Sequence, residues 1–437
     1  MKSLLKSWGR YPNISQTPNE CYWRSEVSCL LSTVVAKYKT TLPYGNGRSY
    51  GDSCLALTDQ VIVTRNLNRF LRVDWETGII VAEAGVTLAE VLAVAIPKGW
   101  FLSVTPGTQF ATIGGAIAND VHGKNHHSKG TFGNHLRGFG LIRSDVGYMN
   151  CSPSENVDMF AATIGGLGLT GIITYAEIQL SPISSSFIDS HVVRFDNLRE
   201  FFALSKELDE KHEYSVAWID CLASGKNLGR GIYIVGDHSR FGSLTVQHSN
   251  NFNVPFTPTI SIVNNYSLRA FNEAYWRLHP QNSKQQRQTY SSFFYPLDRI
   301  LNWNRIYGRS GFQQYQCVIP DKNAEVAVAE LLKSIAVHGQ GSFLAVLKRC
   351  GGIQSPGLMS FPLSGTSLAL DFPQSSKLAK LFDQLDEIVR LSGGRLYPAK
   401  DAHMKGADFR QAYPEWEHLE SMRDPTLVSH FWQRVMK

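Results

Sequence analysis

The stretch LPYGNGRSYGDSC, residues 42 to 54, places three glycines beside an arginine, two tyrosines and an aspartate. Glycines at positions 45, 47 and 51 permit positive φ angles and let backbone N–H groups converge on an anion without obstruction. The spacing matches neither the phosphate loop of nucleoside triphosphatases nor the glycine pattern that opens a Rossmann unit. Taken alone, the stretch is consistent with a phosphate-binding loop or with a tight turn between strands.

Two further glycine-bearing stretches favour the phosphate-binding interpretation. TPGTQFATIGGAIANDVHGKNHHSKGTFGNH, residues 105 to 135, contains Gly107, the glycine pair 114–115 and a cluster of Asn, His and Lys. TIGGLGLTGIITYAEI, residues 163 to 178, places four glycines directly before a predicted strand. Three such segments in one part of the chain suit close contact of the backbone with a long, flat ligand that carries a pyrophosphate.

The elements that position these segments follow from hydrophobic periodicity. In the first ~180 residues, strands are predicted over 60–67, on both sides of the Glu-Thr-Gly turn in 71–85, and over 171–181. TLAEVLAVAIPKG predicts a helix that is capped by Thr87 and ends at Pro97 and Gly99. This part of the chain is therefore expected to alternate strands with short helices.

The second part of the chain predicts another sheet covered by helices. Strands are expected over 215–224, 229–238 and 312–320, followed by a helix that starts near Asp321. SSKLAKLFDQLDEIVRLSGG, residues 375 to 394, predicts an amphipathic helix opened by a serine cap and closed by Gly393 and Gly394. Its apolar stripe is core material and carries no functional information.

Composition narrows the class of protein. The chain has 437 residues, 43% of them hydrophobic, which suits one large or two coupled globular domains. The net charge of +6 comes without a long Lys/Arg block, so a nucleic-acid partner is not expected. Seven scattered cysteines without a CxxC pair favour a cytoplasmic protein, and no signal peptide or bilayer-spanning segment is predicted.

The glycine-bearing segments, in this order, resemble the FAD-binding half of the vanillyl-alcohol-oxidase/p-cresol-methylhydroxylase flavoprotein superfamily. Longer motifs are similar to the decaprenylphosphoryl-β-D-ribose 2-oxidase family: GRSYGD, GGAIANDVHGKNHHSKGTFGNH, GLTGII, YPLDRILNWNRIYGRSGFQQYQCVIP, SFPLSGTSLALDFP and GGRLYPAKD. The resemblance runs from about Trp8 to the C-terminus. It implies an α+β flavoprotein with an FAD-binding domain over 1–182 and a substrate domain, an antiparallel sheet flanked by helices, over 183–393. Residues 394–437 then return to the FAD-binding domain.

The resemblance also implies an activity. An FAD-dependent oxidoreductase would oxidise the 2-hydroxyl of a polyprenylphosphoryl-β-D-ribose to the 2-keto intermediate of epimerisation to the arabinose lipid donor. A nicotinamide-dependent keto-reductase would complete the epimerisation, quinone or oxygen would accept the electrons, and the protein would touch the inner face of the cell membrane peripherally. Two alternatives are a soluble alditol or aldonolactone oxidase, and a non-catalytic lipid- or glycan-binding protein.

Site residues carry over from the resemblance position by position. Lys400, His122 and Tyr50 match catalytic positions, and Lys124, Trp218, Gln314, Gln316, Lys348 and Lys400 match positions that bind substrate. The FAD-contacting positions match Pro43, Gly45, Asn46, Gly47, Arg48, Ser49, Tyr50, Gly51, Asp52, Ser53, Gly107, Thr112, Ile113, Gly114, Gly115, Asn119, Asp120, Val121, His122, Ile173 and Tyr397.

Several positions depart from the wider family. Many relatives bind FAD covalently through a histidine in the first loop, where this chain has Arg48, so a non-covalent flavin is expected. Mycobacterial members carry a cysteine and an asparagine where this chain has Ala369 and Ser367, and a tyrosine is replaced by Phe294. These changes bear on which polyprenyl chain and which pentose bind.

Two sets of residues allow more than one interpretation. His122 and His126 have the i, i+4 spacing of helical metal ligands, but Gly123 lies between them and no H-E-x-x-H pattern follows, so no metal site is predicted. Residues 250–292 are rich in Asn, Gln, Ser and aromatics, with no acidic residue from 274 through 297. They are interpreted either as a mobile surface excursion or as a basic, aromatic flap that covers a ligand or rests on a lipid surface.

Overall fold

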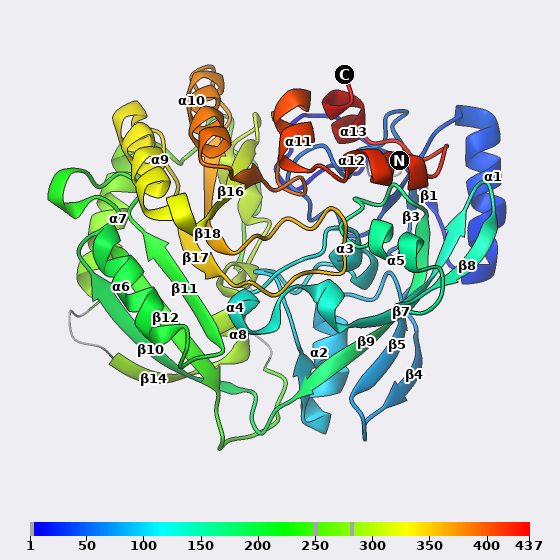
Figure 1. Cartoon of the computed structure of the whole chain (residues 1–437), viewed down its shortest axis with the longest axis horizontal. Helices are drawn as coiled ribbons and strands as arrows, with labels where there is room; N and C mark the ends of the chain where they lie inside the picture. Colours follow the sequence, from blue (N-terminus) through cyan, green and yellow to red (C-terminus); the bar gives the residue numbers. More distant parts are fainter. Residues whose placement is uncertain (1–3, 248–251, 280–283) are drawn as a thin grey trace.

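The computed structural model describes residues 4–247, 252–279 and 284–437. Two α+β units stand side by side (Figure 1), and the C-terminal helices lie over the top between them. The first unit contains two small sheets and the second contains one large sheet. This arrangement agrees with the fold class expected from the sequence.

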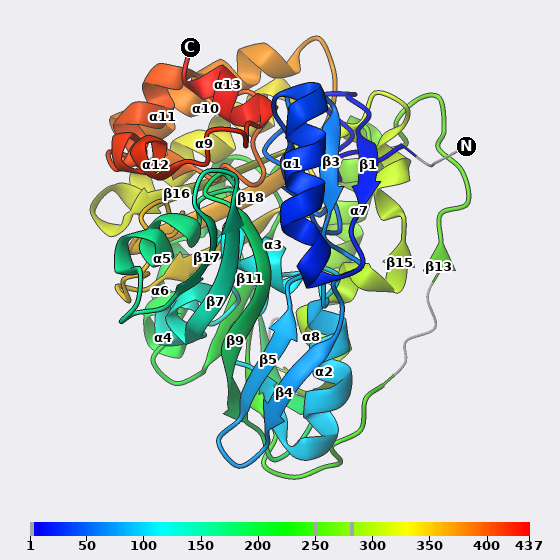
Figure 2. The same cartoon turned by 90° about the vertical axis from the view of Figure 1, so that its right-hand side faces the viewer.

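The first unit begins with a three-stranded parallel sheet. Its strand order is β1-β3-β2, built from β1 (Thr17–Glu20), β2 (Leu42–Tyr44) and β3 (Gln60–Val63). Helix α1 (Val27–Tyr38) connects β1 to β2 and lies against the sheet (Figure 2). Its buried residues Val27, Leu31 and Val34 share a core with Ile62 of β3 and with Leu427. The C-terminal segment is therefore already part of this first core.

The second sheet of the first unit is antiparallel. It has the order β4-β5-β9-β7-β8, with β6 pairing to β9. Its strands are β4 (Phe70–Asp74), β5 (Ile79–Glu83), β6 (Trp100–Leu102), β7 (Leu136–Arg143), β8 (Gly147–Cys151) and β9 (Ile172–Pro182). The helices of this part are α2 (Leu88–Ala95), α3 (Ile113–Ala118), α4 (His126–Lys129) and α5 (Val157–Thr163).

Helix α2 forms where the sequence predicts it. The Thr87 hydroxyl accepts a hydrogen bond from Glu90 N–H, and the Glu90 carboxylate accepts one from Thr87 N–H, which is a capping box. The chain turns away after a short 3₁₀ segment, η2 (Ile96–Lys98), at Gly99, whose φ is 82°. Both predicted boundaries of this helix are confirmed.

The second unit contains an eight-stranded antiparallel sheet in the order β14-β10-β12-β11-β17-β18-β16-β19. The strands are β10 (Phe187–Phe195), β11 (Tyr214–Ile219), β12 (Gly231–His238), β14 (Lys284–Thr289), β16 (Phe312–Pro320), β17 (Val346–Cys350), β18 (Gly365–Pro373) and β19 (Arg395–Leu396). Its helices are α6 (Leu198–Leu208), α7 (Asn265–Leu278), α8 (Tyr290–Phe294), α9 (Ala324–His338) and α10 (Leu378–Leu391). A separate short pair joins β13 (Phe252–Asn253) to β15 (Ile300–Leu301).

The helix predicted over 375–394 forms as α10, but its start differs from the prediction. The N-cap residue is Lys377 in a helical conformation, and no side chain caps the helix. Ser375 contributes only its carbonyl oxygen, which accepts the Leu378 N–H at 3.2 Å. The predicted serine cap is therefore wrong, whereas Gly393, with φ of 70°, follows the helix end as predicted.

Residues 250–292, interpreted from the sequence either as a mobile surface excursion or as a basic, aromatic flap, contain regular secondary structure in their described part. Helix α7 and strand β14 both fall within this range, and β14 extends the large sheet by pairing with β10. Asn264 caps α7 by accepting hydrogen bonds from Tyr266 N–H and Ser267 N–H. Residues 250–251 and 280–283 lie outside the described residues.

The last helices join the two units. α11 (Gly406–Ala412), α12 (Trp416–Met422) and α13 (His430–Val435) follow β19, which itself pairs with β16 of the large sheet. Thr41 and Leu427 then form a parallel bridge in the first unit, and Asp424 accepts hydrogen bonds from the backbone and hydroxyl of Ser144. The chain end is thereby attached to both units.

Two further findings concern the described residues only. None of their helices combines the length and the apolar character that a bilayer span requires. All seven cysteines lie in these ranges and none forms a disulfide.

Replacement of Leu385 tests the packing of α10 on the large sheet. Leu385 is completely buried in the main core, whereas Leu391 on the same helix is exposed. Leu385→Ala should lower the free energy of unfolding by about 2–5 kcal/mol, because it removes packed methyl groups and leaves a cavity. Leu391→Ala should change it by less than about 0.5 kcal/mol. Denaturant unfolding of both variants checks this, and equal losses would contradict the packing described.

Candidate active site

A cavity of about 390 Å³ lies between the two units. The first unit contributes the loop after β2, the segment around α3 and residues near β9, while β11, β16, β17 and β18 contribute the opposite wall. Predicted cofactor-binding residues that line it are Pro43, Gly45, Asn46, Gly47, Arg48, Ser49, Tyr50, Ser53, Gly107, Thr112, Gly114, Gly115, Asn119, Val121, His122, Ile173 and Tyr397. Predicted substrate-binding residues that line it are Lys124, Gln314, Gln316, Lys348 and Lys400. The structure thus gathers most of the predicted site around one cavity.

The loop after β2 lies very close to the segment that starts α3. A Cβ added to Gly45 would be 2.5 Å from the Thr112 hydroxyl oxygen, so only glycine permits this approach. Asn46 holds the two segments together by donating a hydrogen bond from its side chain to the Phe110 carbonyl at 2.8 Å. The two segments therefore form one continuous wall of backbone, as a pyrophosphate-binding surface requires.

Several buried polar atoms in the cavity wall lack a protein partner. They are Arg48 Nε, Ser53 Oγ, His122 Nδ1 and one carboxylate oxygen of Asp371. Burying such atoms without hydrogen bonds is costly, so their presence fits a polar ligand that supplies the missing partners. The Arg48 guanidinium also lies over the Trp8 ring at 4.3 Å. These residues fit a cofactor with phosphate groups and a ring system.

Three lysines make the substrate side of the cavity strongly basic. Lys124 Nζ donates to the Phe293 carbonyl at 2.7 Å, and Lys348 Nζ donates to the Gly123 carbonyl at 2.6 Å. Burial lowers the pKa of Lys124 to about 7, with a further contribution from Lys348, and it lowers the pKa of Lys348 to about 8. A bound anion would reverse both shifts, because it stabilises the charged ammonium. The lysines therefore favour a phosphate-bearing ligand.

Lys400 lies beside Tyr50 at the junction of the two walls. Its Nζ is 3.7 Å from the centre of the Tyr50 ring. Burial lowers the pKa of Lys400 to about 7, against the opposing effect of the Asp371 carboxylate. Burial likewise raises the pKa of Asp371 to about 7, although Gln314 donates a hydrogen bond to it at 2.6 Å and Lys400 attracts its charge. Lys400 can therefore both hold and release a proton near neutral pH.

His122 lines the same cavity as Lys400 and is held in its neutral form. Burial, followed by the nearby charges of Lys348, His126 and Lys400, lowers the pKa of His122 well below its ordinary value. Its Nε2 accepts a hydrogen bond from the Gln316 amide nitrogen at 3.3 Å, so Nδ1 carries the proton of the neutral ring. A neutral histidine in this position can donate a hydrogen bond to a substrate oxygen.

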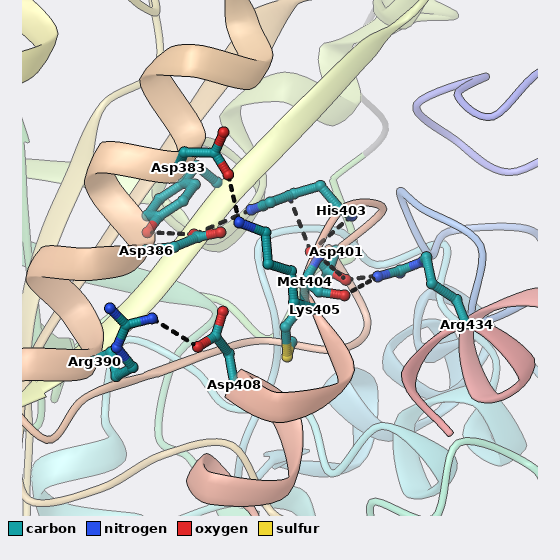
Figure 3. A network of polar contacts seen from close by, with 10 residues as sticks. Asp383, Asp386, Arg390, Asp401, His403, Met404, Lys405, Asp408 and Arg434 are labelled. Carbon is teal, nitrogen blue, oxygen red and sulfur yellow. Dashed lines mark hydrogen bonds and ion pairs between the residues drawn. The ribbon is translucent and has the colours of Figure 1, made fainter. Parts of the chain in front are cut away.

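A largely buried ionic network fixes the turn that carries Lys400, and Figure 3 shows the part of it formed by Asp401, His403 and Arg434. The neighbouring Asp401 is 1% exposed and accepts a hydrogen bond from Arg434 Nη2 at 2.8 Å. The same guanidinium binds both carboxylate oxygens of Asp52, at 2.9 and 3.0 Å. Tyr50 N–H donates to the Ala399 carbonyl at 3.0 Å. Arg434 thereby connects the loop after β2 to the turn that carries Lys400.

His403 completes this network from the side of α10 (Figure 3). Its ring lies 3.0 Å from an Asp401 oxygen and 3.2 Å from an Asp386 oxygen, and Asp386 also accepts the Tyr315 hydroxyl at 3.0 Å. Although burial acts in the opposite direction, the two carboxylates raise the pKa of His403 to about 10. Although burial acts in the opposite direction, Arg434 and His403 together hold the pKa of Asp401 well below its usual range. Asp401 and His403 therefore form a charged pair at neutral pH.

Five predicted site residues lie behind the cavity wall instead of in it. Asp52 binds Arg434, and Gly51 is pressed against the Asp401 carbonyl, which leaves no room for a Cβ. Asp120 accepts hydrogen bonds from Gly133 N–H at 2.9 Å and from the Ser355 hydroxyl at 2.5 Å, so it anchors a loop.

The other two residues behind the wall are apolar or aromatic. Ile113 is completely buried in the core of the first unit. Trp218 donates its indole N–H to the Phe343 carbonyl at 2.9 Å and packs on Tyr275 of α7. Val216, two residues earlier on the same face of β11, lines the cavity in the place expected for Trp218.

Two carboxylates of the cavity wall were missed by sequence reasoning. Asp371 follows Leu370 in the motif LALDFP, and Asp298 lies in YPLDR. Asp298 accepts hydrogen bonds from the Thr108 hydroxyl and from Gln109 N–H, both at 2.8 Å, and so fixes the segment after Gly107. Burial raises the pKa of Asp298 to about 6, against these bonds and the Arg48 charge. The sequence feature that could have identified these two residues is a single acidic residue within an otherwise apolar or aromatic run.

Comparisons with known proteins agree with this geometry. A family model described as an FAD binding domain matches residues 24–152. The chain is 34% identical over 396 residues to decaprenylphosphoryl-β-D-ribose oxidase of Mycolicibacterium smegmatis, an alignment that covers 87% of this chain and 85% of the relative. It is 30% identical over 361 residues to a Streptomyces coelicolor protein named for the mprA 5′ region, covering 78% and 97%. It is 28% identical over 204 residues to L-gulonolactone oxidase of Mus musculus, covering 45% and 44%.

Fold and site together define an FAD-binding oxidoreductase of the vanillyl-alcohol-oxidase type. Within that class, the alignment with the Mycolicibacterium smegmatis relative covers most of both chains, and its 34% identity shows that the two proteins are homologous. The chain belongs to the decaprenylphosphoryl-β-D-ribose oxidase family.

Replacement of His403 should change how stability depends on pH. The folded-state pKa of about 10 exceeds the value of 6.5 for a free side chain, so the ion pairs contribute fully below about pH 6.5. Their contribution is lost progressively as the pH rises toward 10. His403→Gln should therefore melt at a lower temperature than the wild type at pH 6, and the difference should shrink by pH 10. Thermal melts across this range test this, with the exposed His418→Gln as control; a difference independent of pH would contradict the charged state of His403.

Proposed function

We propose that the protein oxidises the 2-hydroxyl of a polyprenylphosphoryl-β-D-ribose to the 2-keto intermediate of epimerisation to the arabinose lipid donor. The observation that carries the proposal is that three lysines, Lys124, Lys348 and Lys400, line the same cavity as the glycine-rich segments. A phosphodiester needs positive charge beside it, and a sugar hydroxyl needs a nearby group that can take its proton. The relative from Mycolicibacterium smegmatis, named as an oxidase of this lipid-linked ribose, supports the same substrate class.

The residues of the chain divide into three roles under this proposal. FAD, held non-covalently by the loop 43–53 and by the segments around Gly107, α3 and Tyr397, supplies the acceptor for the hydride from C2. Lys400 accepts the hydroxyl proton, since its lowered pKa leaves a neutral fraction near pH 7. His122 Nδ1 and the Tyr50 hydroxyl orient the sugar oxygen.

Lys124 and Lys348 would hold the phosphodiester, and Gln314 and Gln316 would bind the remaining sugar hydroxyls. Gln314 and Gln316 lie on one face of β16, and both line the cavity. Gln314 is also hydrogen-bonded to Asp371, which fixes the direction of its amide. Trp218 lies behind the wall, so Val216 would make the contact with substrate that was expected of Trp218.

The proposal also includes the partners and the organisation expected from the family. A nicotinamide-dependent keto-reductase would consume the 2-keto product, quinone or oxygen would reoxidise the flavin, and the enzyme would meet its lipid at the inner face of the cell membrane. We place the FAD-binding domain at 1–182 and the substrate domain at 183–393, with 394–437 returning to the former. The pairing of Thr41 with Leu427 supports the last of these assignments.

Trapping of the product tests the substrate and the position of oxidation. Purified holoenzyme is incubated with a polyprenylphosphoryl-ribose and an electron acceptor, and the mixture is then reduced with sodium borodeuteride. A ketone at C2 incorporates one deuterium at that carbon, as ribose and arabinose epimers. Unlabelled ribose, or label at another carbon, would refute the proposal.

Lys400→Met should lower the yield of trapped product per unit time by about 100-fold or more, because it removes the proton acceptor at the reacting hydroxyl. Lys405→Met is the matched control, since Lys405 is exposed and bound only to Asp383. The control should retain wild-type turnover. Both variants should still bind flavin; comparable turnover of Lys400→Met and the control would remove Lys400 from catalysis.

Acid precipitation should release all flavin from the protein. Arg48 cannot form the covalent bond that a histidine forms in many relatives, and the one cysteine of the cavity wall, Cys54, has its pKa raised to about 12 by burial. Its thiol is therefore protonated and unreactive at neutral pH. Visible absorption of the supernatant after precipitation measures the release. Flavin that remains with the denatured protein would show a covalent link.

A further inference from the structure

A segment we call the strap, residues 252–262, runs along the surface beside residues 300–308. Its first strand, β13, pairs in parallel with β15, and Ile262 N–H donates to the Ile306 carbonyl at 3.1 Å. Arg305 fixes the middle of the strap by donating to the carbonyls of Val254 and Pro255 at 2.8 and 3.0 Å. Apart from Thr257, whose hydroxyl accepts a hydrogen bond from Arg10 at 2.9 Å, these contacts are made by the backbone of the strap. Figure 2 shows β13 and β15 on one side of the molecule.

The outward side chains of the strap are large and apolar. Exposed fractions are 79% for Phe252, 70% for Phe256, 79% for Ile260 and 57% for Ile262, and the adjacent Ile300 is 40% exposed. Single exposed apolar residues are ordinary, but five in one pair of adjoining segments are typical of an interaction surface.

The strap and the segment beside it carry charges of one sign. Residues 252–272 and 299–320 contain no Asp or Glu, whereas Arg299 and Arg309 are exposed beside the strap. Such a surface is complementary to an anionic partner. Two copies of it facing each other would bring like charges together, which disfavours a symmetric dimer through this surface.

The strap also lies next to the entrance of the cavity. Pro296 and Gly107 line the cavity and are themselves exposed, so they belong to its mouth. Pro296 opens the 3₁₀ helix η5 (Pro296–Arg299), which leads directly into β15, the partner of the strap. Trp303, in the next 3₁₀ helix η6 (Trp303–Tyr307), again lines the cavity. A partner bound to the strap would thus lie near the mouth.

We propose that the strap, with Ile300, Arg299 and Arg309, is a docking surface for a lipid bilayer that contains anionic headgroups. The aromatic and aliphatic side chains enter the headgroup region, and the arginines contact lipid phosphates. This inference rests on the proposed function, because docking here would bring the mouth of the cavity to a lipid-linked sugar in the same bilayer. The face of the molecule that carries the strap would then be the face that meets the membrane.

Vesicle co-sedimentation of the holoenzyme tests the surface without any substrate. Wild-type protein should bind vesicles of phosphatidylglycerol and phosphatidylcholine, and binding should be weaker with phosphatidylcholine alone. Phe256→Ser/Ile260→Ser should lower the partition coefficient about tenfold or more, since transfer of two large apolar side chains is lost. Arg299→Gln/Arg309→Gln should lower it on anionic vesicles only. Val337→Ser/Leu391→Ser, which changes two exposed apolar residues on α9 and α10, should bind as the wild type does.

Two controls keep this test separate from the test of the proposed function. The flavin spectrum and the melting temperature of each variant should match the wild type, which excludes misfolding. Turnover of a short-chain polyprenylphosphoryl-ribose in detergent should be equal in wild type and strap variants. If no protein turns over this substrate while vesicle binding follows the pattern above, the proposed function fails and the docking surface stands. If wild type and strap variants bind vesicles equally, or if the strap variants lose only a concentration-dependent dimer, the docking surface is refuted.

Discussion

The bond of Arg434 to both Asp52 and Asp401 is the interaction on which the geometry of the site depends. It joins the loop after β2, the turn that carries Lys400 and the last helix of the chain. Charged groups buried together are stable only when each hydrogen-bonding position is satisfied, and breaking one partner leaves an uncompensated charge. The network therefore allows one arrangement of the two loops. That arrangement places Lys400 against Tyr50 at the junction of the two units.

The lysines inside the cavity differ from the groups of the network, because they are not paired with carboxylates in the same way. There Lys348 is buried and Lys124 and Lys400 are half-buried, and removal from water lowers the pKa values of all three. In the network the charges are paired, whereas the ammonium groups of the cavity outnumber the carboxylates that line it. A bound anion would stabilise the charged forms of these lysines. The cost of removing charged groups from water thus makes the network rigid on one side of Lys400, and on the other side it favours the binding of an anion in the cavity.

The sequence was informative where local chemistry decides the structure. The capping box at Thr87, the apolar stripe of α10 and the glycine stretches followed from short-range patterns, and the resemblance supplied the family. Sequence patterns did not predict the structure where contacts link residues that are far apart in the chain. Asp52 and Arg434 are 382 residues apart, so no local pattern showed that Asp52 binds the last helix instead of a cofactor. Likewise, the resemblance gave Trp218 as a substrate-binding position, but only the packing of Tyr275 of α7 on its ring shows that this part of β11 is covered.

The anaerobic visible spectrum of the purified protein during titration with a polyprenylphosphoryl-ribose tests the central claim most directly. The account predicts stoichiometric loss of the oxidised flavin band near ~450 nm, because the sugar would deliver its hydride within the cavity of Lys400. A band that stays unchanged with this lipid but bleaches with a free alditol or aldonolactone would contradict the account and identify a soluble-sugar oxidase.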